Sequence, residues 1–94
     1  MWVLYIVECG DSSLYCGITT NVERRIHEHN HTRKGAKYTR SRRPVKLVCT
    51  LDYPDRSRSS KAEAAFKKMP TALKRKLVKD PPRLIQELQQ IVSR

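Results

Sequence analysis

The stretch that decides the fold is MWVLYIVECGDSSLYCGITTNVERRIHEH, which runs over residues 1–29. Residues 2–9 are rich in apolar, β-branched and aromatic side chains, a composition that favours a strand. Residues 10–12, Gly-Asp-Ser, are typical of a turn, and residues 13–17 form a second short extended run. The pattern therefore predicts a β-hairpin at the start of the chain.

A helix is expected directly after this hairpin, over residues 21–30. Thr20 is followed three residues later by Glu23, which is the spacing of a capping box. Because each residue turns a helix by about 100°, one face of it holds Val22, Arg25, Ile26 and His29. An unpaired charge that faces a core costs several kcal/mol. We therefore expect Arg25 and His29 to have partners.

The two adjacent arginines of this helix point in different directions. Arg24 projects away from the mixed face, near Glu23 and Glu28, and is expected on a solvated surface with salt bridges. Arg25 is the candidate functional arginine. The alternative is that Arg25 lies at the edge of the face, with its methylene groups on the core and its guanidinium in water.

The rest of the chain predicts one more strand and three helices. Residues 45–53 have the β-branched content of a strand. Helices are expected over residues 60–69, over residues 71–79 and from Asp80 onward. The last helix has an apolar stripe that would cover the sheet, formed by Leu84, Ile85, Leu88, Ile91 and Val92. The predicted fold is therefore α+β, an α/β sandwich in the order β-β-α-β-α-α-α.

Length and charge narrow the class of protein. Ninety-four residues without a repeat or a flexible linker predict a single domain over residues 1–94. Twenty Lys and Arg against nine Asp and Glu give a net charge of +11, which favours a polyanionic partner. Nucleic acid is the first candidate. A membrane is not expected, because the polar side of the last helix is not basic enough for a membrane surface.

Cysteine use and the start of the chain bear on location. Cys9, Cys16 and Cys49 are an odd number and too far apart for a zinc-ligand pair, so we expect reduced thiols in strands. The apolar run at the start is shorter than a membrane span and lacks the features of a cleaved leader. These observations predict a cytoplasmic protein.

A basic loop without acidic residues lies between the first helix and the third strand. Its candidate nucleic-acid-binding residues are Arg33, Lys34, Lys37, Tyr38, Arg40, Arg42 and Arg43. Several Lys and Arg on one loop bind phosphates through counterion release, and an aromatic ring can stack on an unpaired base. A solvated loop without a partner is the alternative.

Glu63 is the carboxylate that stands beside a predicted buried helix face, next to Phe66. It could hold a hard cation. Ser60 and Glu63 also have capping-box spacing, so the glutamate could simply cap the start of its helix. The pattern alone favours the cap.

Two short motifs resemble those of the GIY-YIG nuclease superfamily. Leu4-Tyr5-Ile6 is similar to the first tripeptide, and Tyr15-Cys16-Gly17 is similar to the second, ten residues ahead of Arg25. Tyr15 and Gly17 match the outer residues of that second motif. The resemblance extends through residues 34–48 and 62–69, and it is greatest to the short, stand-alone bacterial members.

The resemblance implies a three-stranded antiparallel sheet flanked by helices and metal-dependent hydrolysis of DNA phosphodiesters. It implies one divalent cation, Mg²⁺ or Mn²⁺, held by Glu63. Tyr5 and Tyr15 would line the site and orient or deprotonate the attacking water, while Arg25 would neutralise charge on the phosphate. His29 falls where the family carries a tyrosine or histidine, and its imidazole is a second candidate base.

A second function stays open at this point. A module of this fold could bind nucleic acid through the basic loop 33–46 without catalysis, because no asparagine follows the glutamate helix where several active members carry one. DNA is the expected partner and RNA is an alternative, while the oligomeric state is undetermined. With no second domain expected, cutting would be structure-selective or weakly specific, and any role in repair would rest on analogy.

Overall fold

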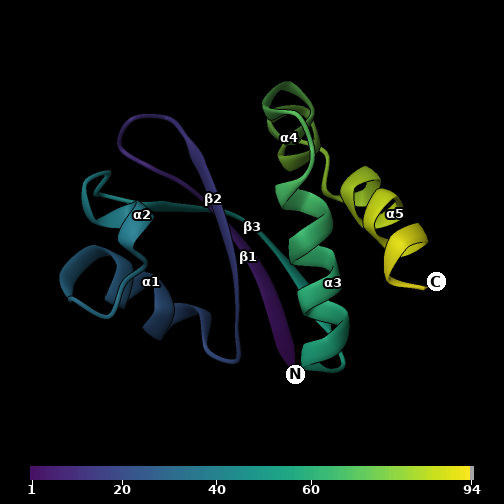
Figure 1. Cartoon of the computed structure of the whole chain (residues 1–94), viewed down its shortest axis with the longest axis horizontal. Coiled ribbons are helices and arrows are strands. Elements are labelled where there is room, and N and C mark those ends of the chain that lie inside the picture. Colours follow the sequence, from purple (N-terminus) through teal and green to yellow (C-terminus); the bar gives the residue numbers. More distant parts are fainter. Residues whose placement is uncertain (94) are drawn as a thin grey trace.

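The computed structural model describes residues 1–93, and over this range the predicted order of elements is confirmed (Figure 1). The elements are β1 (Trp2–Glu8), β2 (Leu14–Thr19), α1 (Val22–His31), α2 (Lys37–Arg40), β3 (Lys46–Tyr53), α3 (Arg56–Lys67), α4 (Thr71–Val78) and α5 (Pro81–Val92). One element was not predicted. The short helix α2 lies inside the basic loop, where a run of charged residues gives no hydrophobic periodicity to reveal it.

The three strands form one antiparallel sheet in the order β2-β1-β3, as the resemblance implied. β1 is therefore central, and β2 and β3 are the two edges. Because side chains alternate along a strand, Leu4 and Ile6 of β1 point to one face and Tyr5 and Val7 to the other. In the register of the hairpin, Tyr5 lies opposite Gly17.

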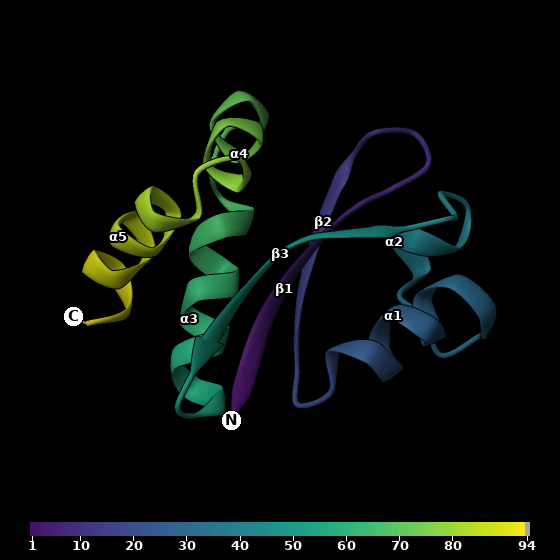
Figure 2. The same ribbon diagram turned by 180° about the vertical axis from the view of Figure 1, so that it is seen from behind.

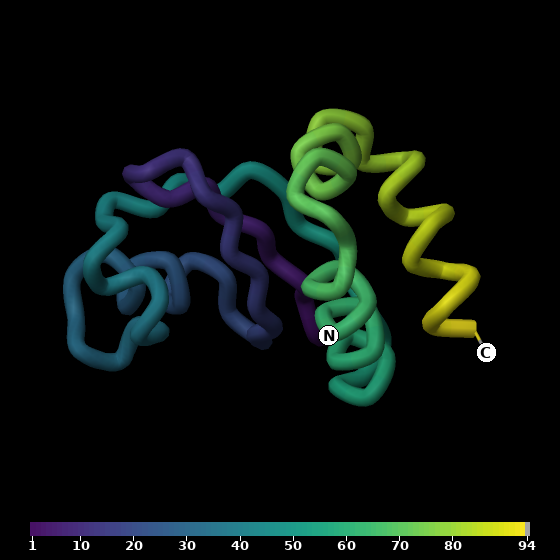
Figure 3. The backbone as a smooth tube through the Cα atoms, turned by 45° about the horizontal axis from the view of Figure 1, so that its top comes forward, coloured from purple at the N-terminus to yellow at the C-terminus, as the bar shows by residue number. Residues whose placement is uncertain are grey.

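Helices cover both faces of the sheet, as Figures 1 and 2 show from opposite sides. α1 packs on the face that carries Tyr5 and Val7, through its half-buried Val22 and Ile26. The other face is covered by α3, whose Phe66 belongs to the larger core cluster. Figure 3 shows the two helical groups on either side of the strands, with α5 outermost. The sheet thus separates α1 and α2 from α3–α5.

The last helix differs in part from its predicted role. Leu84, Leu88 and Val92 are buried, but Ile85 and Ile91 are 46% and 38% exposed. α5 packs mainly against α3 and α4, so it covers α3 rather than lying directly on the sheet. A helix in this outer position buries only a narrow stripe, which leaves the flanking isoleucines at the surface.

Two helix starts also differ from the prediction. Asn21, not Thr20, caps α1, because its side-chain oxygen accepts the backbone N–H of Arg24 at 3.0 Å. α3 begins at Arg56, earlier than predicted, and Asp55 caps it through the N–H of Arg58 at 2.8 Å. Glu63 therefore lies in the middle of α3, and the hypothesis that it caps this helix is wrong.

The three cysteines are free thiols, as the sequence predicted. Cys9, Cys16 and Cys49 are all buried and unpaired. Among the described residues, no helix has the length and apolar character needed to cross a membrane.

Asn30 joins α1 to the entrance of β3. Its side-chain amide donates to the carbonyl of Val45 at 3.1 Å, and its oxygen accepts the backbone N–H of Val45 at 2.7 Å. This pair replaces the two hydrogen bonds that a neighbouring strand would supply to a residue just before an edge strand. The contact fixes the distance between α1 and the strand that follows the basic loop.

We predict that Asn30→Ala lowers the free energy of unfolding by about 2 kcal/mol, because it leaves partly buried backbone groups of Val45 without a partner. Urea denaturation measures the change. His31→Ala, at an exposed neighbouring position, is the control. Equal losses in the two variants would show that the Asn30 contact contributes nothing of its own.

Candidate active site

The centre of the site is a hydrogen bond between two fully buried side chains, Tyr5 and His29. Tyr5 Oη lies 2.7 Å from Nε2 of His29, which reaches it from α1. On the other side of the imidazole, Nδ1 lies 3.0 Å from the Thr39 hydroxyl and accepts the backbone N–H of Ala36 at 3.2 Å. The hydroxyl of Thr39 in turn donates to the Ala36 carbonyl at 2.8 Å. The start of α2 therefore holds the imidazole in place.

These contacts assign the proton of the imidazole. Because the N–H of Ala36 points at Nδ1, that nitrogen is the acceptor and carries no proton. A neutral imidazole then carries its proton on Nε2 and donates it to Tyr5 Oη. The hydrogen of the Tyr5 hydroxyl is left to point elsewhere. His29 thus donates a hydrogen bond to Tyr5 Oη, which is the acceptor.

Burial shifts the pKa of both partners. Burial lowers the pKa of His29 to about 4, and the positive charge of Arg25 adds to this effect, so the imidazole is neutral near pH 7. Burial raises the pKa of Tyr5 to about 12, although Arg25 acts in the opposite direction. Tyr5 is therefore a neutral phenol until additional positive charge stabilises its phenolate.

The pKa of His29 makes the stability depend on pH. An unfolded histidine titrates near 6.5, so between pH 6.5 and about 4 the unfolded chain binds more protons than the folded one. We predict that protonation of this residue lowers the free energy of unfolding by about 3 kcal/mol as the pH falls through that window.

Urea denaturation at several pH values measures this effect, with His29→Gln as the test and His31→Gln as the control. The His29 variant should lose the slope between pH 6.5 and about 4, and the control should keep it. NMR of the ring nitrogens of His29 should find the proton on Nε2. A proton on Nδ1, or an unchanged slope in His29→Gln, would contradict the assignment.

Gly17 makes room for the Tyr5 ring. A Cβ atom at position 17 would lie 2.4 Å from Tyr5 Oη and 2.7 Å from its ring carbon Cζ, closer than atoms can approach. The two residues are cross-strand partners, so neither can move away without breaking the hairpin register. The glycine of the second motif therefore serves the tyrosine of the first.

We predict that Gly17→Ala destabilises the fold by about 1–3 kcal/mol, because the added methyl group must displace the Tyr5 ring. Thermal denaturation measures this, with Thr20→Ala at an exposed position as the control. The variant should also break the contact between Tyr5 and His29. Unchanged stability together with an unchanged NMR signal for the His29 ring would sink this explanation of the glycine.

A second aromatic group extends the site outward from His29. The ring of Tyr15, on β2, lies edge-on to the imidazole with centroids 5.5 Å apart. Tyr38, on α2, stacks on Tyr15 at 5.7 Å, and the guanidinium of Arg42 lies 4.0 Å from the centre of the Tyr38 ring. Arg42 is anchored by Asp11 in the β1–β2 turn at 3.0 Å. The Tyr38 ring, predicted to stack on a base, is thus already in contact with two protein groups.

Arg25 is half-buried and has the partner that the helix pattern required. Its Nη1 donates to Glu28 Oε1 at 3.0 Å and to the backbone carbonyl of Lys34 at 2.8 Å. The hydrogen bond from Arg25 holds the pKa of Glu28 below its ordinary value. Glu28 was expected beside Arg24 on the solvated face, but it pairs with Arg25. Both of these hydrogen bonds use Nη1.

Glu63 comes from α3, on the opposite side of the sheet from α1. Its side chain is 24% exposed and pairs with Lys67 at 3.7 Å. The negative charge of Glu63 contributes to the raised pKa of both Tyr5 and Tyr15, after the larger effect of burial. The carboxylate therefore acts on both phenols. Tyr5 and Tyr15 are thus each within electrostatic reach of both Arg25 and Glu63.

A carboxylate suits a hard cation such as Mg²⁺ or Mn²⁺, which takes oxygen ligands and commonly uses one or two carboxylates together with water and phosphate. Within residues 1–93, no three His, Cys, Asp or Glu side chains gather closely enough to hold a metal by themselves. Glu63 fits a site in which one protein carboxylate holds the cation, because the remaining ligands would come from water and from a bound phosphate.

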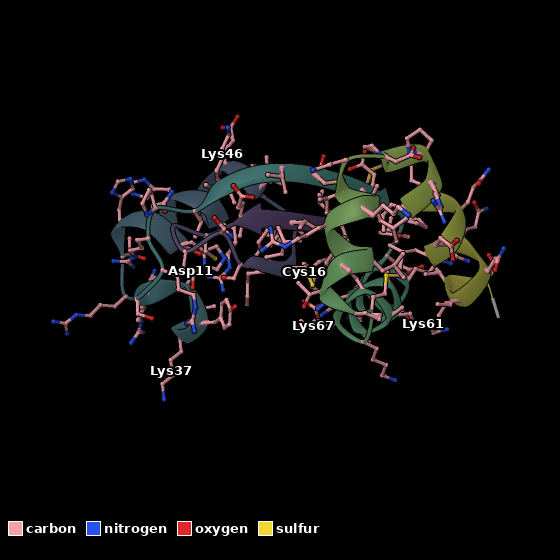
Figure 4. The ribbon with its side chains drawn as sticks, turned by 90° about the horizontal axis from the view of Figure 1, so that it is seen from above. Asp11, Cys16, Lys37, Lys46, Lys61 and Lys67 are labelled. Atoms are coloured by element: carbon pink, nitrogen blue, oxygen red, sulfur yellow. The ribbon has the colours of Figure 1, made fainter. Side chains whose placement is uncertain are left out.

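The structure separates the predicted nucleic-acid-binding residues into two groups. Arg43 is engaged with the end of α1, where it donates to the carbonyls of His29, at 2.6 Å, and Thr32. Arg40 donates to the carbonyl of Arg33 at 2.6 Å. Arg33, Lys34 and Lys37 are exposed, and Figure 4 shows Lys37 pointing away from the molecule. Arg33, Lys34 and Lys37 are therefore the loop residues best placed to reach a phosphate.

Three participants escaped prediction from the sequence. Thr39 lies ten residues from His29 without a repeat or motif to connect them. Asp11 was assigned only to a turn, although it also anchors Arg42. Lys67 could have been found, because Glu63 and Lys67 have the i, i+4 spacing of a helical ion pair.

Comparison with known proteins agrees with this geometry. The family model that matches is the GIY-YIG catalytic domain, over residues 1–76. The three-stranded antiparallel sheet with its flanking helices agrees with this match. This chain belongs to the GIY-YIG family. Membership indicates cleavage of nucleic-acid phosphodiesters, and nucleases of this family generally use divalent metal ions.

The relatives are short proteins. A UPF0213 protein of Desulfotalea psychrophila is 58% identical over 78 residues, which cover 83% of this chain and 71% of that protein. A UPF0213 protein of Syntrophus aciditrophicus is 51% identical over 79 residues, or 84% of this chain and 91% of that one. The solution NMR structure of the UPF0213 protein BH0048 from Bacillus halodurans is 42% identical, with a TM-score of 0.55 and 84% of each chain covered. The chain is therefore similar to stand-alone GIY-YIG proteins.

Proposed function

We propose that this protein is a metal-dependent nuclease that hydrolyses DNA phosphodiester bonds, with Tyr5 as the base. The observation that carries the proposal is the buried hydrogen bond from a neutral His29 to Tyr5 Oη. A proton on Nε2 stabilises the phenolate form of Tyr5, which can then take a proton from water. Family membership and a net charge of +11 support a nucleic acid as the substrate.

Each residue has a separate role in this scheme. The Tyr5 phenol first releases its own proton to solvent. Water then attacks phosphorus while its proton passes to the Tyr5 phenolate oxygen, and the bond from phosphorus to the leaving oxygen breaks, with that oxygen taking a proton from solvent. Arg25 neutralises the charge that develops on the phosphate, because its planar donors match phosphate oxygens. His29 acts through Tyr5 and is a positioning residue, since Tyr5, Thr39 and the Ala36 backbone use both its nitrogens.

Glu63 is the residue that would hold the cation. A divalent ion held there would supply positive charge to the phosphate and to the leaving oxygen. Tyr15 lines the site between His29 and Tyr38 and orients water or substrate. Buried thiols and a nucleic-acid substrate fit a cytoplasmic location.

A second candidate function is nucleic-acid binding without catalysis. The observation that favours it is the ion pair between Glu63 and Lys67, because an ammonium already neutralises the carboxylate that a cation would need. This pair is 52% exposed on the lysine side, and such surface pairs contribute little and open readily. The nuclease is therefore the better supported function.

We predict that Arg25→Ala and Glu63→Gln each reduce cleavage by at least about a hundredfold, because each removes a charge that acts on the transition state. The assay uses labelled single-stranded, duplex, flap and branched DNA with Mg²⁺ or Mn²⁺. Arg24→Ala, on the neighbouring exposed position, is the control and should keep its activity.

The result decides between the two functions. Cleavage by the parent and by Arg24→Ala, with loss in both test variants, supports the nuclease, and the best-cut substrate defines its specificity. If the parent cuts none of these substrates with either metal but binds them at low salt, the non-catalytic module is correct. Circular dichroism of each variant confirms that the fold is retained.

A further inference from the structure

A second basic surface lies outside the predicted loop, at the end of α3 and on α4. Residues 64–79 contain no acidic residue, and their basic side chains are Lys67, Lys68, Lys74, Arg75, Lys76 and Lys79. The like charges repel one another unless a polyanion neutralises them. Three of them have contacts that place them beside the candidate active site. We call Lys67, Lys74 and Arg75 the α3–α4 basic surface.

Lys67 lies next to the residue that would hold the cation, and Lys74 lies near the same part of α3. Lys67 pairs with Glu63 at 3.7 Å, and Figure 4 shows Lys67 close to Cys16 of β2. The ammonium of Lys74 lies 5.7 Å from the centre of the Phe66 ring. Burial raises the pKa of Cys16 to about 11, and Lys67 and Lys74 both act to lower it, while Glu63 raises it. The two lysines and Glu63 therefore surround the same point of β2.

The third member of the surface reaches the β1–β2 turn. Arg75 Nη2 donates to the carbonyl of Ser12 at 2.6 Å. From the other side of the sheet, Arg42 Nε donates to Asp11 Oδ2 in the same turn at 3.0 Å. One arginine from each helical layer thus anchors the hairpin tip. The basic residues of the loop that contains α2 and those of α4 meet at this turn through Arg42 and Arg75.

β2 itself is suited to lie between two phosphate-binding surfaces. It is an edge strand, so no neighbouring strand covers its outer side. Tyr15 faces the α1 and α2 side, whereas Cys16 faces α3. The proposed base and arginine therefore lie on one side of this strand and Glu63 on the other. A phosphate that contacts both must sit at the edge of β2.

We infer that the α3–α4 basic surface binds the sugar–phosphate backbone on one side of the cleaved bond, while the exposed residues of the loop bind it on the other. This inference rests on the proposed function for the position of the cleaved phosphate. The nucleic-acid strand crosses the edge of β2, with nucleotides bound on both sides.

The first test measures binding to labelled single-stranded DNA in EDTA, where no cleavage takes place. Each phosphate contact contributes about 0.7 to the slope of log affinity against log salt concentration. The double variant Lys74→Gln with Arg75→Gln should lower this slope by about 1.4, which corresponds to two lost contacts. The control is Lys61→Gln with Arg83→Gln, which removes the same charge from α3 and α5. Figure 4 shows that Lys61 lies on the α5 side of α3, away from Lys67.

Equal slopes in the double variant and its control would overturn the inference, because net charge alone would then explain the binding. If loss of the Arg75 contact with Ser12 unfolds the double variant, Lys74→Gln against Lys61→Gln gives the same comparison with an expected change of about 0.7.

The second test uses closed circular single-stranded DNA with Mg²⁺ or Mn²⁺. The parent should linearise the circle, and the double variant should raise KM with little change in kcat, because it removes binding shared by substrate and transition state. Trimming of linear DNA with intact circles would overturn the inference. A protein that cuts nothing but shows the predicted fall in salt slope retains the second binding surface, and in that case only the proposed function fails.

Discussion

The hydrogen bond between Tyr5 and His29 is the interaction on which the rest of the site depends. It joins the central strand to α1, and it exists only because Gly17 leaves space beside the Tyr5 ring. Both partners are fully buried, so each would be costly if it lost the other. Ala36, at the start of α2, holds the far side of the imidazole. One contact thus links the hairpin, α1 and the basic loop, and it determines which nitrogen carries the proton.

This arrangement also explains how a weak base could act at neutral pH. Burial raises the pKa of Tyr5, which favours a neutral phenol in the free protein. A donor at Nε2 of His29, the guanidinium of Arg25 and a cation near Glu63 all favour the phenolate instead. The balance therefore depends on metal and substrate binding. Under the proposed function, the phenolate would therefore form only when the phosphate and the cation are bound.

Charge is distributed in a way that matches this chemistry. Basic residues are gathered in the loop that contains α2 and at the end of α3 and on α4, and they meet at the β1–β2 turn through Arg42 and Arg75. The groove lined by Asp52, Asp55 and α5 lies elsewhere, between β3 and the outer helix. This groove is lined by Arg58 and Lys61 as well as by the two aspartates, so it carries no net charge, whereas the basic residues of the loop and of the α3–α4 basic surface border β2.

The sequence by itself determined the order of the strands and longer helices and the family, because strand composition, helical periodicity and the spacing from Tyr15 to Arg25 are local properties. It could not decide how distant side chains pair. Only the tertiary structure showed that Thr39 and Ala36 contact His29 and that the carbonyl of Lys34 accepts a hydrogen bond from Arg25. These contacts depend on how the loop folds back on α1. The periodicity of the sequence does not indicate such contacts, because they form between segments that are far apart in the sequence.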